Sequence, residues 1–209
     1  MNNCTMKMKK ILSLAVVALM MCACNANKCV KPLPAGYSPD SLSNCTVPAV
    51  FTVDDFDWAA NTLQIKVYSQ DLYDIVEIGY LAVGDTLVFQ GRPIVVNSID
   101  RGKYGFITVN GGIEHDGAEL APCEGGTYRG ILLDDHAVYT LLGTATLPLA
   151  DDFVMIDCGS EPNDPFDTIR NNAKDYIQKL TVKDNFNELN TEVLIKDGKI
   201  TQINRRWIP

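Results

Sequence analysis

The side chains best suited to chemistry are the two histidines, and each lies beside carboxylates. His115 stands between an acidic residue on either side in the segment 114–116, and His136 directly follows Asp134 and Asp135. Histidine and carboxylate groups bind divalent metals or exchange a proton in general acid–base catalysis. One interpretation is therefore a metal-dependent or His/Asp-based hydrolase, with His115, His136 and Asp134 as catalytic candidates and Asp134, Asp135 and His136 as metal ligands.

Other catalytic or metal-binding motifs are weak. Aspartate pairs at 54–55, 134–135 and 151–152 suggest calcium loops, because calcium prefers oxygen ligands. None of the pairs has the spacing of a D-x-[DN]-x-[DN]-G loop, and the sequence contains no GxSxG nucleophile motif. The main expectation is a non-catalytic module without a cofactor, and calcium or another divalent ion is the alternative.

Four cysteines follow position 24, at 29, 45, 123 and 158. In an exported chain four cysteines allow three pairings. Pairing of neighbours along the chain joins Cys29 to Cys45 and Cys123 to Cys158, and four reduced thiols are the alternative. No CxxC motif occurs among them, so neither a zinc knuckle nor a thioredoxin-type redox pair is expected.

The first residues have the pattern of an export signal. Lys7, Lys9 and Lys10 precede the segment 11–21, which is apolar except for Ser13. As a helix this segment spans about 17 Å, well short of the roughly 30 Å hydrocarbon core of a bilayer. It therefore indicates a signal peptide and not a membrane-spanning anchor.

The apolar segment ends in the sequence Met-Cys-Ala-Cys at 21–24, which resembles the lipobox of bacterial lipoproteins. In that family the cysteine after a small residue is acylated and becomes the new N-terminus. Cys24, preceded by Ala23, is the expected lipidation site, and Cys22 is the alternative. The box departs from the family pattern at Met21, where leucine is usual, and at Cys22, where a small non-thiol residue is usual.

The resemblance implies a cellular location for the protein. By this resemblance, residues 1–23 are a signal peptide, and acylated Cys24 anchors the chain in the lipid bilayer. Residue 25 is asparagine and not aspartate, which for such lipoproteins implies sorting to the outer membrane of a Gram-negative cell. The chain is similar in this respect to small exported lipoproteins that carry a β-rich domain, whose partner here would be an unknown protein or glycan.

The charge of the expected mature chain excludes one class of partner. The segment before Cys24 holds three of the 18 Lys and Arg residues and none of the 26 Asp and Glu residues. The remainder carries 15 basic against 26 acidic residues, a formal net charge of −11. Nucleic-acid binding requires a basic face, so this balance argues against it.

The elements behind the anchor predict a tether and one domain. Prolines at 32, 34, 39 and 48, with no periodic apolar pattern, predict a Pro-rich tether over 24–49. A single β-rich globular domain is expected over 50–209. Its strands are indicated by apolar alternation and turn residues in the segments 63–69, 86–90, 94–99, 104–109, 127–133, 137–147, 153–157 and 191–207, the last divided by Asp197-Gly198.

One late helix interrupts the strands. Asp164 and Pro165 suit the first positions of a helix, and Phe166, Ile169, Ala173, Tyr176, Ile177 and Leu180 then share one side. This helix should pack on a sheet. The predicted fold is mainly β, an antiparallel sandwich or small barrel-like structure, and α+β by a strict count.

The anchor can be tested by the intact mass of the protein purified from its native membrane. We expect a mass that matches cleavage before Cys24 and acylation of that residue. Alkylation under non-reducing conditions counts the thiols of the mature chain and so identifies any disulfides. Cleavage elsewhere without an acyl chain would contradict the lipoprotein interpretation.

Overall fold

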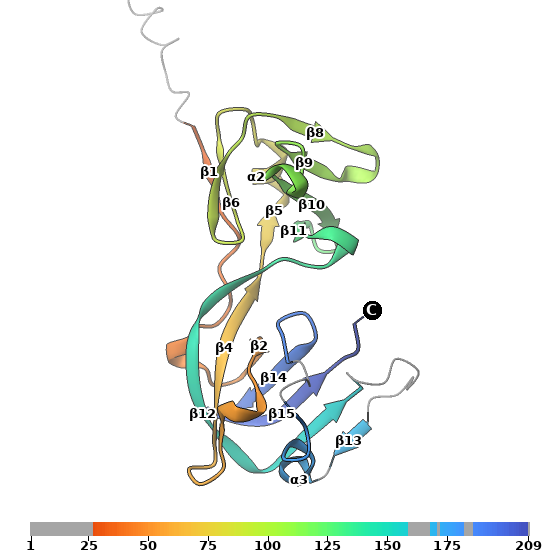
Figure 1. Ribbon diagram of the computed structural model, residues 1–209. Coiled ribbons are helices and arrows are strands. Elements are labelled where there is room, and N and C mark those ends of the chain that lie inside the picture. The colour runs from red at the N-terminus through yellow and green to blue at the C-terminus, as the bar shows by residue number, and fades with distance from the viewer. Residues whose placement is uncertain (1–26, 159–167, 171, 182–185, 209) are drawn as a thin grey trace, which may run out of the picture.

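The computed structural model describes two lobes joined by two long strands, β4 (Thr62–Gln70) and β12 (Tyr139–Asp157) (Figure 1). The residues described are 27–158, 168–170, 172–181 and 186–208. Each lobe has its own cluster of buried apolar side chains. The mainly β, α+β fold predicted from the sequence is confirmed.

The large lobe is a sheet that closes on itself. β12 pairs antiparallel with β4 up to Pro148 and then, from Leu149 onward, parallel with β15 (Lys199–Arg205). From β15 the order continues through β14 (Thr191–Lys196) and β2 (Cys45–Val50) back to β4. Because β12 changes partner along its length, these strands form a closed ring like a small barrel. β3 (Phe56–Asp57) and β13 (Thr168–Arg170) extend the sheet from β4 and β12.

Strict alternation fills the ring with apolar side chains. Leu63, Ile65 and Val67 of β4 are fully buried, whereas the residues between them face outward. The same pattern of inward residues recurs on β14, where Val193 and Ile195 have no exposed surface. A strand with one buried face requires this period of two, so the pattern fixes the register of the ring.

Apart from β1, the small lobe is inserted between β4 and β12. Its five-stranded sheet has the order β5 (Leu72–Asp74), β11 (Thr127–Ile131), β10 (Ala118–Cys123), β9 (Ile107–Val109) and β8 (Ile99–Arg101). A three-stranded sheet consists of β1 (Cys29–Val30), β6 (Thr86–Phe89) and β7 (Arg92–Val95). Their buried faces share one core, with Tyr73, Leu87 and Leu120 among its fully buried members.

Short helices connect the strands. α2 (Ile75–Gly79) begins after Asp74, whose carboxylate accepts the N–H groups of Val76 and Glu77. α3 (Ala173–Ile177) packs on the core of the large lobe. The 3-10 turns are η1 (Pro39–Ser41), η2 (Val53–Asp55), η3 (Lys103–Gly105), η4 (Ile113–His115) and η5 (Leu133–Asp135).

The tether predicted over 24–49 is wrong for its described part. Residues 29–30 form β1 and residues 45–50 form β2, and Val30, Leu42 and Val47 are buried. The prolines obscured the alternation of Val47 and Ala49, which belong to a strand paired on both edges. The body predicted to begin at residue 50 therefore starts at least as early as β1, and it has two lobes instead of one core.

The late helix is much shorter than predicted. Residues 159–167, which include its expected start, lie outside the described residues, and Thr168–Arg170 form a strand that pairs with the end of β12. The helical part is Ala173–Ile177, and Ala173 and Ile177 pack on the core as expected. An apolar residue at 169 is compatible with a strand as well as with a helix. The segment is a strand because it pairs with the edge of β12.

Two further predictions need correction. The sheets are not purely antiparallel, since β12 with β15 and β1 with β6 run parallel. The strands expected over 86–90 and 94–99 form the β6–β7 hairpin, but the turn is at Gln90 and Gly91, both with positive φ, so β7 already begins at Arg92. The hairpin around Asp197-Gly198 is confirmed with its turn as predicted.

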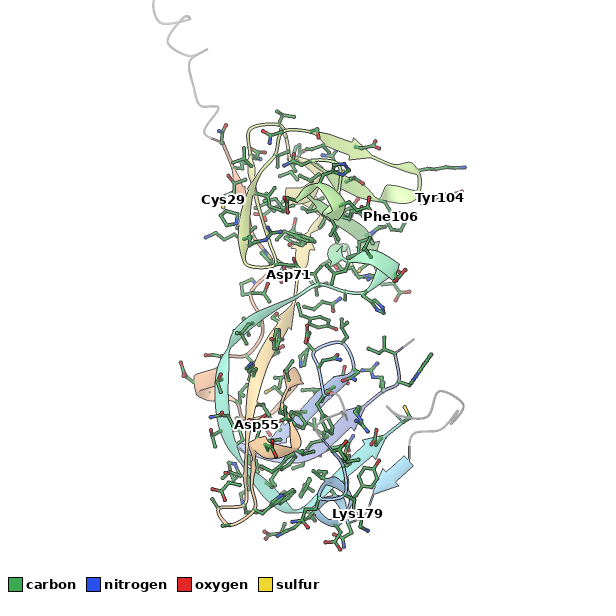
Figure 2. The ribbon with its side chains drawn as sticks, in the orientation of Figure 1. Cys29, Asp55, Asp71, Tyr104, Phe106 and Lys179 are labelled. Atoms are coloured by element: carbon green, nitrogen blue, oxygen red, sulfur yellow. The ribbon has the colours of Figure 1, made fainter. Side chains whose placement is uncertain are left out.

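A buried carboxylate joins the lobes where β4 ends and β5 begins. Asp71 is 1% exposed and lies between the lobes in Figure 2. It accepts hydrogen bonds from the Thr140 hydroxyl (2.7 Å) and from the Gln90 N–H (3.0 Å). Burial raises the pKa of the Asp71 carboxyl above its usual value, and these hydrogen bonds oppose the rise.

A second buried carboxylate holds the far end of β12. Asp157 forms a bidentate ion pair with Arg205 of β15, with N···O distances of 2.8 and 2.7 Å, and both side chains are almost fully buried. The Tyr176 hydroxyl donates to the same carboxylate at 2.6 Å, and the guanidinium lies 4.7 Å from the ring centroid of Phe186. α3 is thereby tied to the sheet.

Asp71 gives the folded protein a specific pH dependence. A carboxyl with a raised pKa in the folded chain binds its proton more tightly there, so its contribution to stability is lost as pH rises through that pKa. The free energy of unfolding of wild type minus that of Asp71→Asn should therefore fall as pH rises above the ordinary carboxyl pKa of 3.8. Urea titrations at a series of pH values measure it, and a difference that rises with pH would contradict the expectation.

Truncation of Asp157 should strongly destabilise the large lobe. Asp157→Ala removes both carboxylate oxygens that pair with the buried Arg205 guanidinium. Breaking a buried ion pair in this way costs about 3–5 kcal/mol. Glu192→Ala is the matched control, because Glu192 pairs with Arg206 on the surface, where ion pairs contribute about 0–1 kcal/mol. Equal losses in urea unfolding would show that burial does not decide the effect.

Candidate functional site

His115 lies on the surface of the small lobe, in a turn between β9 and β10. It ends η4, and its ring Nδ1 lies 3.1 Å from the carbonyl oxygen of Gly111. The next residue, Asp116, takes a left-handed conformation and hydrogen-bonds through its N–H to Ile113. The contacts of His115 are thus those of a turn that closes on itself.

His136 follows η5, in a loop that an exposed ion pair holds together. The Arg129 guanidinium donates to the carboxylate of Asp135 (2.7 Å) and to its carbonyl oxygen (2.9 Å). The Leu132 N–H donates to the carbonyl oxygen of His136 at 2.7 Å, and Asp134 and Asp135 both have positive φ. The geometry directs the Asp135 carboxylate toward Arg129 and gives it a structural role.

The predicted metal ligands are not brought together. Within the described part of the chain, no three His, Cys, Asp or Glu side chains are placed to hold a metal ion, so Asp134, Asp135 and His136 do not form the expected site. Their sequence proximity misled the prediction, because Asp134 and Asp135 both take positive φ and the Asp135 carboxylate pairs with Arg129. The aspartates of the 54–55 pair do not complete such a cluster either.

Neither predicted disulfide forms. Cys29 lies in β1 opposite Thr86 of the small lobe, whereas Cys45 lies in β2 opposite Ile195 of the large lobe. Cys123 ends β10 in the small lobe. Cys158 follows β12, and its thiol donates to the carbonyl oxygen of Arg205. The pairing of chain neighbours failed because each predicted pair is divided between the lobes.

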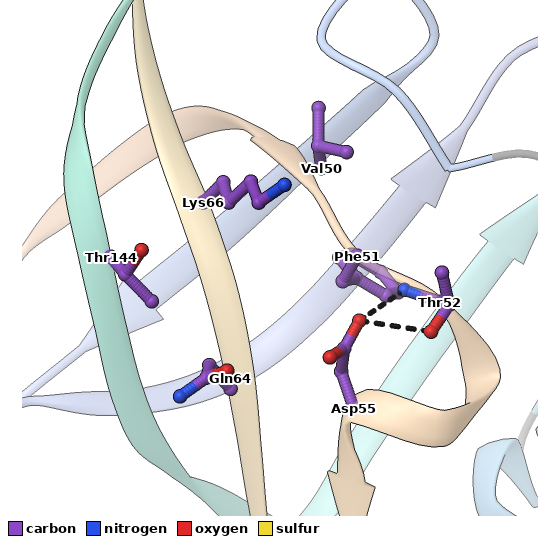
Figure 3. Close-up of a pocket in the computed structure, with 7 residues that line it drawn as sticks. All are labelled: Val50, Phe51, Thr52, Asp55, Gln64, Lys66 and Thr144. Atoms are coloured by element: carbon purple, nitrogen blue, oxygen red, sulfur yellow. Dashed lines mark hydrogen bonds between the residues drawn. The ribbon is translucent and has the colours of Figure 1, made fainter.

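A concavity lies on the outer face of the large lobe, where β4 meets β12 and η2 (Figure 3). A hollow of about 110 Å³ continues into an open recess of about 300 Å³. Asp55 and Gln64 line both, so we treat them as one feature, the polar groove. Its lining residues are Val50, Phe51, Thr52, Asp54, Asp55, Phe56, Asp57, Thr62, Gln64, Lys66, Thr144 and Thr146.

Cross-strand pairing sets the polar wall of the groove. Lys66 lies opposite Thr144, and Gln64 lies opposite Thr146, and all four are exposed. Directly opposite residues of antiparallel strands stand about 5 Å apart, so the pairs form two rungs of polar side chains. Figure 3 shows Lys66 extending from β4 toward Val50 on the neighbouring strand β2.

A capping interaction fixes the opposite wall. The Asp55 carboxylate accepts the N–H (2.6 Å) and the hydroxyl (2.9 Å) of Thr52 through one oxygen, as Figure 3 shows. This capping box closes η2. Beneath it, the ring of Phe51 stacks on Phe186 with centroids 4.5 Å apart and meets Phe56 edge-on. The floor of the groove is therefore a rigid aromatic layer.

The carboxylates of the recess differ in their availability. Asp57 accepts the N–H groups of Ala59 and Ala60, and so shapes its own turn. Asp54 is exposed and makes no hydrogen bond within the described residues. The groove thus presents an ammonium group at one end and a carboxylate at the other, with amide and hydroxyl groups between them.

Sequence reasoning found the strand but not the site. The alternation of β4 placed Gln64 and Lys66 on its outer face, which is confirmed. Their threonine partners lie about eighty positions further along the chain, and no local signal marks that pairing.

Comparison of the chain with protein-family models, with curated proteins and with solved structures gives no match. Within the described residues, no helix has the length and hydrophobicity needed to cross a bilayer. The groove and the first residues of the sequence are therefore the features that bear on function.

Proposed function

We propose that this protein is a non-catalytic lipoprotein of the cell envelope that binds a glycan in the polar groove of its large lobe. The observation that carries the ligand assignment is the pair of polar rungs, Lys66–Thr144 and Gln64–Thr146, beside the fixed carboxylate of Asp55. The anchor is supported by the apolar segment that ends at Cys24. The outer membrane is the proposed location.

The chemistry of the wall favours a sugar over a protein surface. Glutamine and threonine side chains both donate and accept hydrogen bonds, and lysine donates three, which suits vicinal hydroxyl groups. The centres of protein–protein interfaces are instead rich in exposed aromatic and apolar side chains. Here the aromatic residues Phe51 and Phe56 lie buried under the groove, at 3% and 8% exposure.

The size of the groove and its charge restrict the class of ligand that it can bind. A hollow of about 110 Å³ is smaller than the roughly 300–1,000 Å³ of a pocket for a complete small molecule. It suits one unit of a longer chain that continues along the open recess. Asp54 at the recess and the net charge of −11 expected for the mature chain disfavour anionic sugars, so the ligand class is a neutral or amine-bearing glycan.

The hydrolase alternative lacks a comparable site. His115 and His136 occupy two separate turns, and the Asp135 carboxylate is bound to Arg129. Within the described residues no cluster of ligating side chains joins them. No observation therefore favours a metal-dependent or His/Asp-based hydrolase at these positions over a binding role for the groove.

A panel of neutral, amine-bearing and anionic oligosaccharides tests the proposal. We expect binding of a neutral or amine-bearing member, and about tenfold weaker binding by Gln64→Ala or Lys66→Ala, the loss for one hydrogen bond of about 1.4 kcal/mol. Lys196→Ala is the matched control, since Lys196 is exposed on β14 away from the groove. Isothermal titration calorimetry gives the affinities.

Two results would overturn the glycan assignment. The first is that no oligosaccharide of the panel binds. The second is that Lys66→Ala and Lys196→Ala bind a sugar equally well, which would place the site elsewhere on the molecule.

A further inference from the structure

The first described residues enter the small lobe beside three large apolar side chains that face solvent. Tyr80 is 70% exposed, Val83 is 68% exposed and Val95 is 56% exposed. They come from the end of α2, from the turn before β6 and from β7. We call these three residues the N-terminal rim.

Contacts place the rim around the first residues of β1. The Lys28 ammonium lies 5.3 Å from the ring centroid of Tyr80. The Thr86 N–H donates to the carbonyl oxygen of Lys28 at 2.7 Å, and Thr86 lies between Cys29 on one side and Val95 on the other. Val83 adjoins Gly84, whose Cα hydrogen faces the side chain of Asn27.

The rim is not a part of the core that failed to pack. The neighbours of its members in sequence, Leu81, Ile94 and Val96, are at most 8% exposed and belong to the small-lobe core. The alternation in β7 therefore already supplies the core, and Val95 lies on the opposite face. Apolar side chains gathered on one surface indicate contact with an apolar medium or partner.

The expected anchor limits what can cover the rim. Cys24 precedes Asn27 by three residues, which span at most about 11 Å at 3.8 Å per step. An acylated Cys24 lies at the bilayer surface. The rim must therefore lie close to that surface, at a distance comparable to the thickness of the headgroup layer. The folding of residues 29–50 removes the long tether that would have held the body away.

The charges at the rim suit a phospholipid surface. The carboxylate of Asp85 is 7% exposed and accepts the N–H groups of Lys28 (2.7 Å) and Ala82 (2.9 Å), so it faces inward. The Arg101 guanidinium donates to carbonyl oxygens at the end of α2, among them that of Leu81 at 3.0 Å. The Lys28 ammonium over the Tyr80 ring remains on the surface, where it can meet a lipid phosphate.

We propose that the N-terminal rim docks on the phospholipid bilayer that holds Cys24, with Tyr80 and Lys28 at the headgroups and Val83 and Val95 at the acyl boundary. Tyrosine and lysine favour this interfacial layer, and aliphatic side chains favour the layer beneath it. The docking rests on the proposed lipidation of Cys24. The large lobe lies at the opposite end of the molecule, so the polar groove lies far from the membrane (Figures 1 and 2).

Tryptophan quenching in proteoliposomes tests the docking. The acylated, full-length mature protein is reconstituted in vesicles of phosphatidylcholine and phosphatidylglycerol with brominated acyl chains. The native Trp58 and Trp207 belong to the large-lobe part of the chain and should keep their emission. In Val83→Trp and Tyr80→Trp, the brominated chains should quench the fluorescence of the introduced tryptophan. Leu141→Trp is the matched control: Leu141 is exposed on β12, and the fluorescence of a tryptophan there should not be quenched.

The outcomes separate the docking from the anchor. Quenching at both rim positions, with none at Leu141→Trp, supports the proposal. Protein that floats with the vesicles but shows no quenching at either rim position overturns the docking and leaves the lipidation intact. Protein that does not float overturns the lipidation and the docking together, and equal quenching at all three positions overturns a specific orientation.

Discussion

The arrangement of the two lobes depends on one buried carboxylate. At Asp71 the chain leaves β4 for the small lobe, and β12 returns beside it. Its backbone joins Val138 and Gly130 at 2.9 Å each, while its side chain binds the turn of the β6–β7 hairpin and Thr140. An unpaired carboxylate in this position would be too costly to bury, so the three segments must meet there for the fold to be stable.

The same interaction explains why β12 can serve both lobes. Anchored at its start by Thr140 and at its end by Asp157, the strand is free to bend between them and to exchange β4 for β15. The exchange closes the ring and also creates the groove, because the polar rungs need the antiparallel half of β12. The groove and the closure of the barrel thus have one structural cause.

Local patterns predicted the local parts of the fold and failed where pairing is distant. The period of two marked β4, and Asp197-Gly198 marked the β14–β15 hairpin, because both signals lie within a few residues. The tether over 24–49 was mistaken in its described part because the partners that make β2 a strand are 16 to 150 positions away. Likewise, Gln64 and Lys66 were placed outward correctly, but the rungs that make them a site depend on β12.

The closed ring also dictates an order of assembly. β2 near the start of the chain must pair with β14 close to its end, so the large-lobe core is incomplete until the last segment is available. The strands of the small lobe are all present by Ile131, and their pairings are mostly between neighbours. A chain that emerges from its N-terminus can therefore complete the small lobe early, while the barrel waits for the C-terminal hairpin and pays a large loop-closure entropy. Closure of the ring is therefore expected to be the slower step of folding.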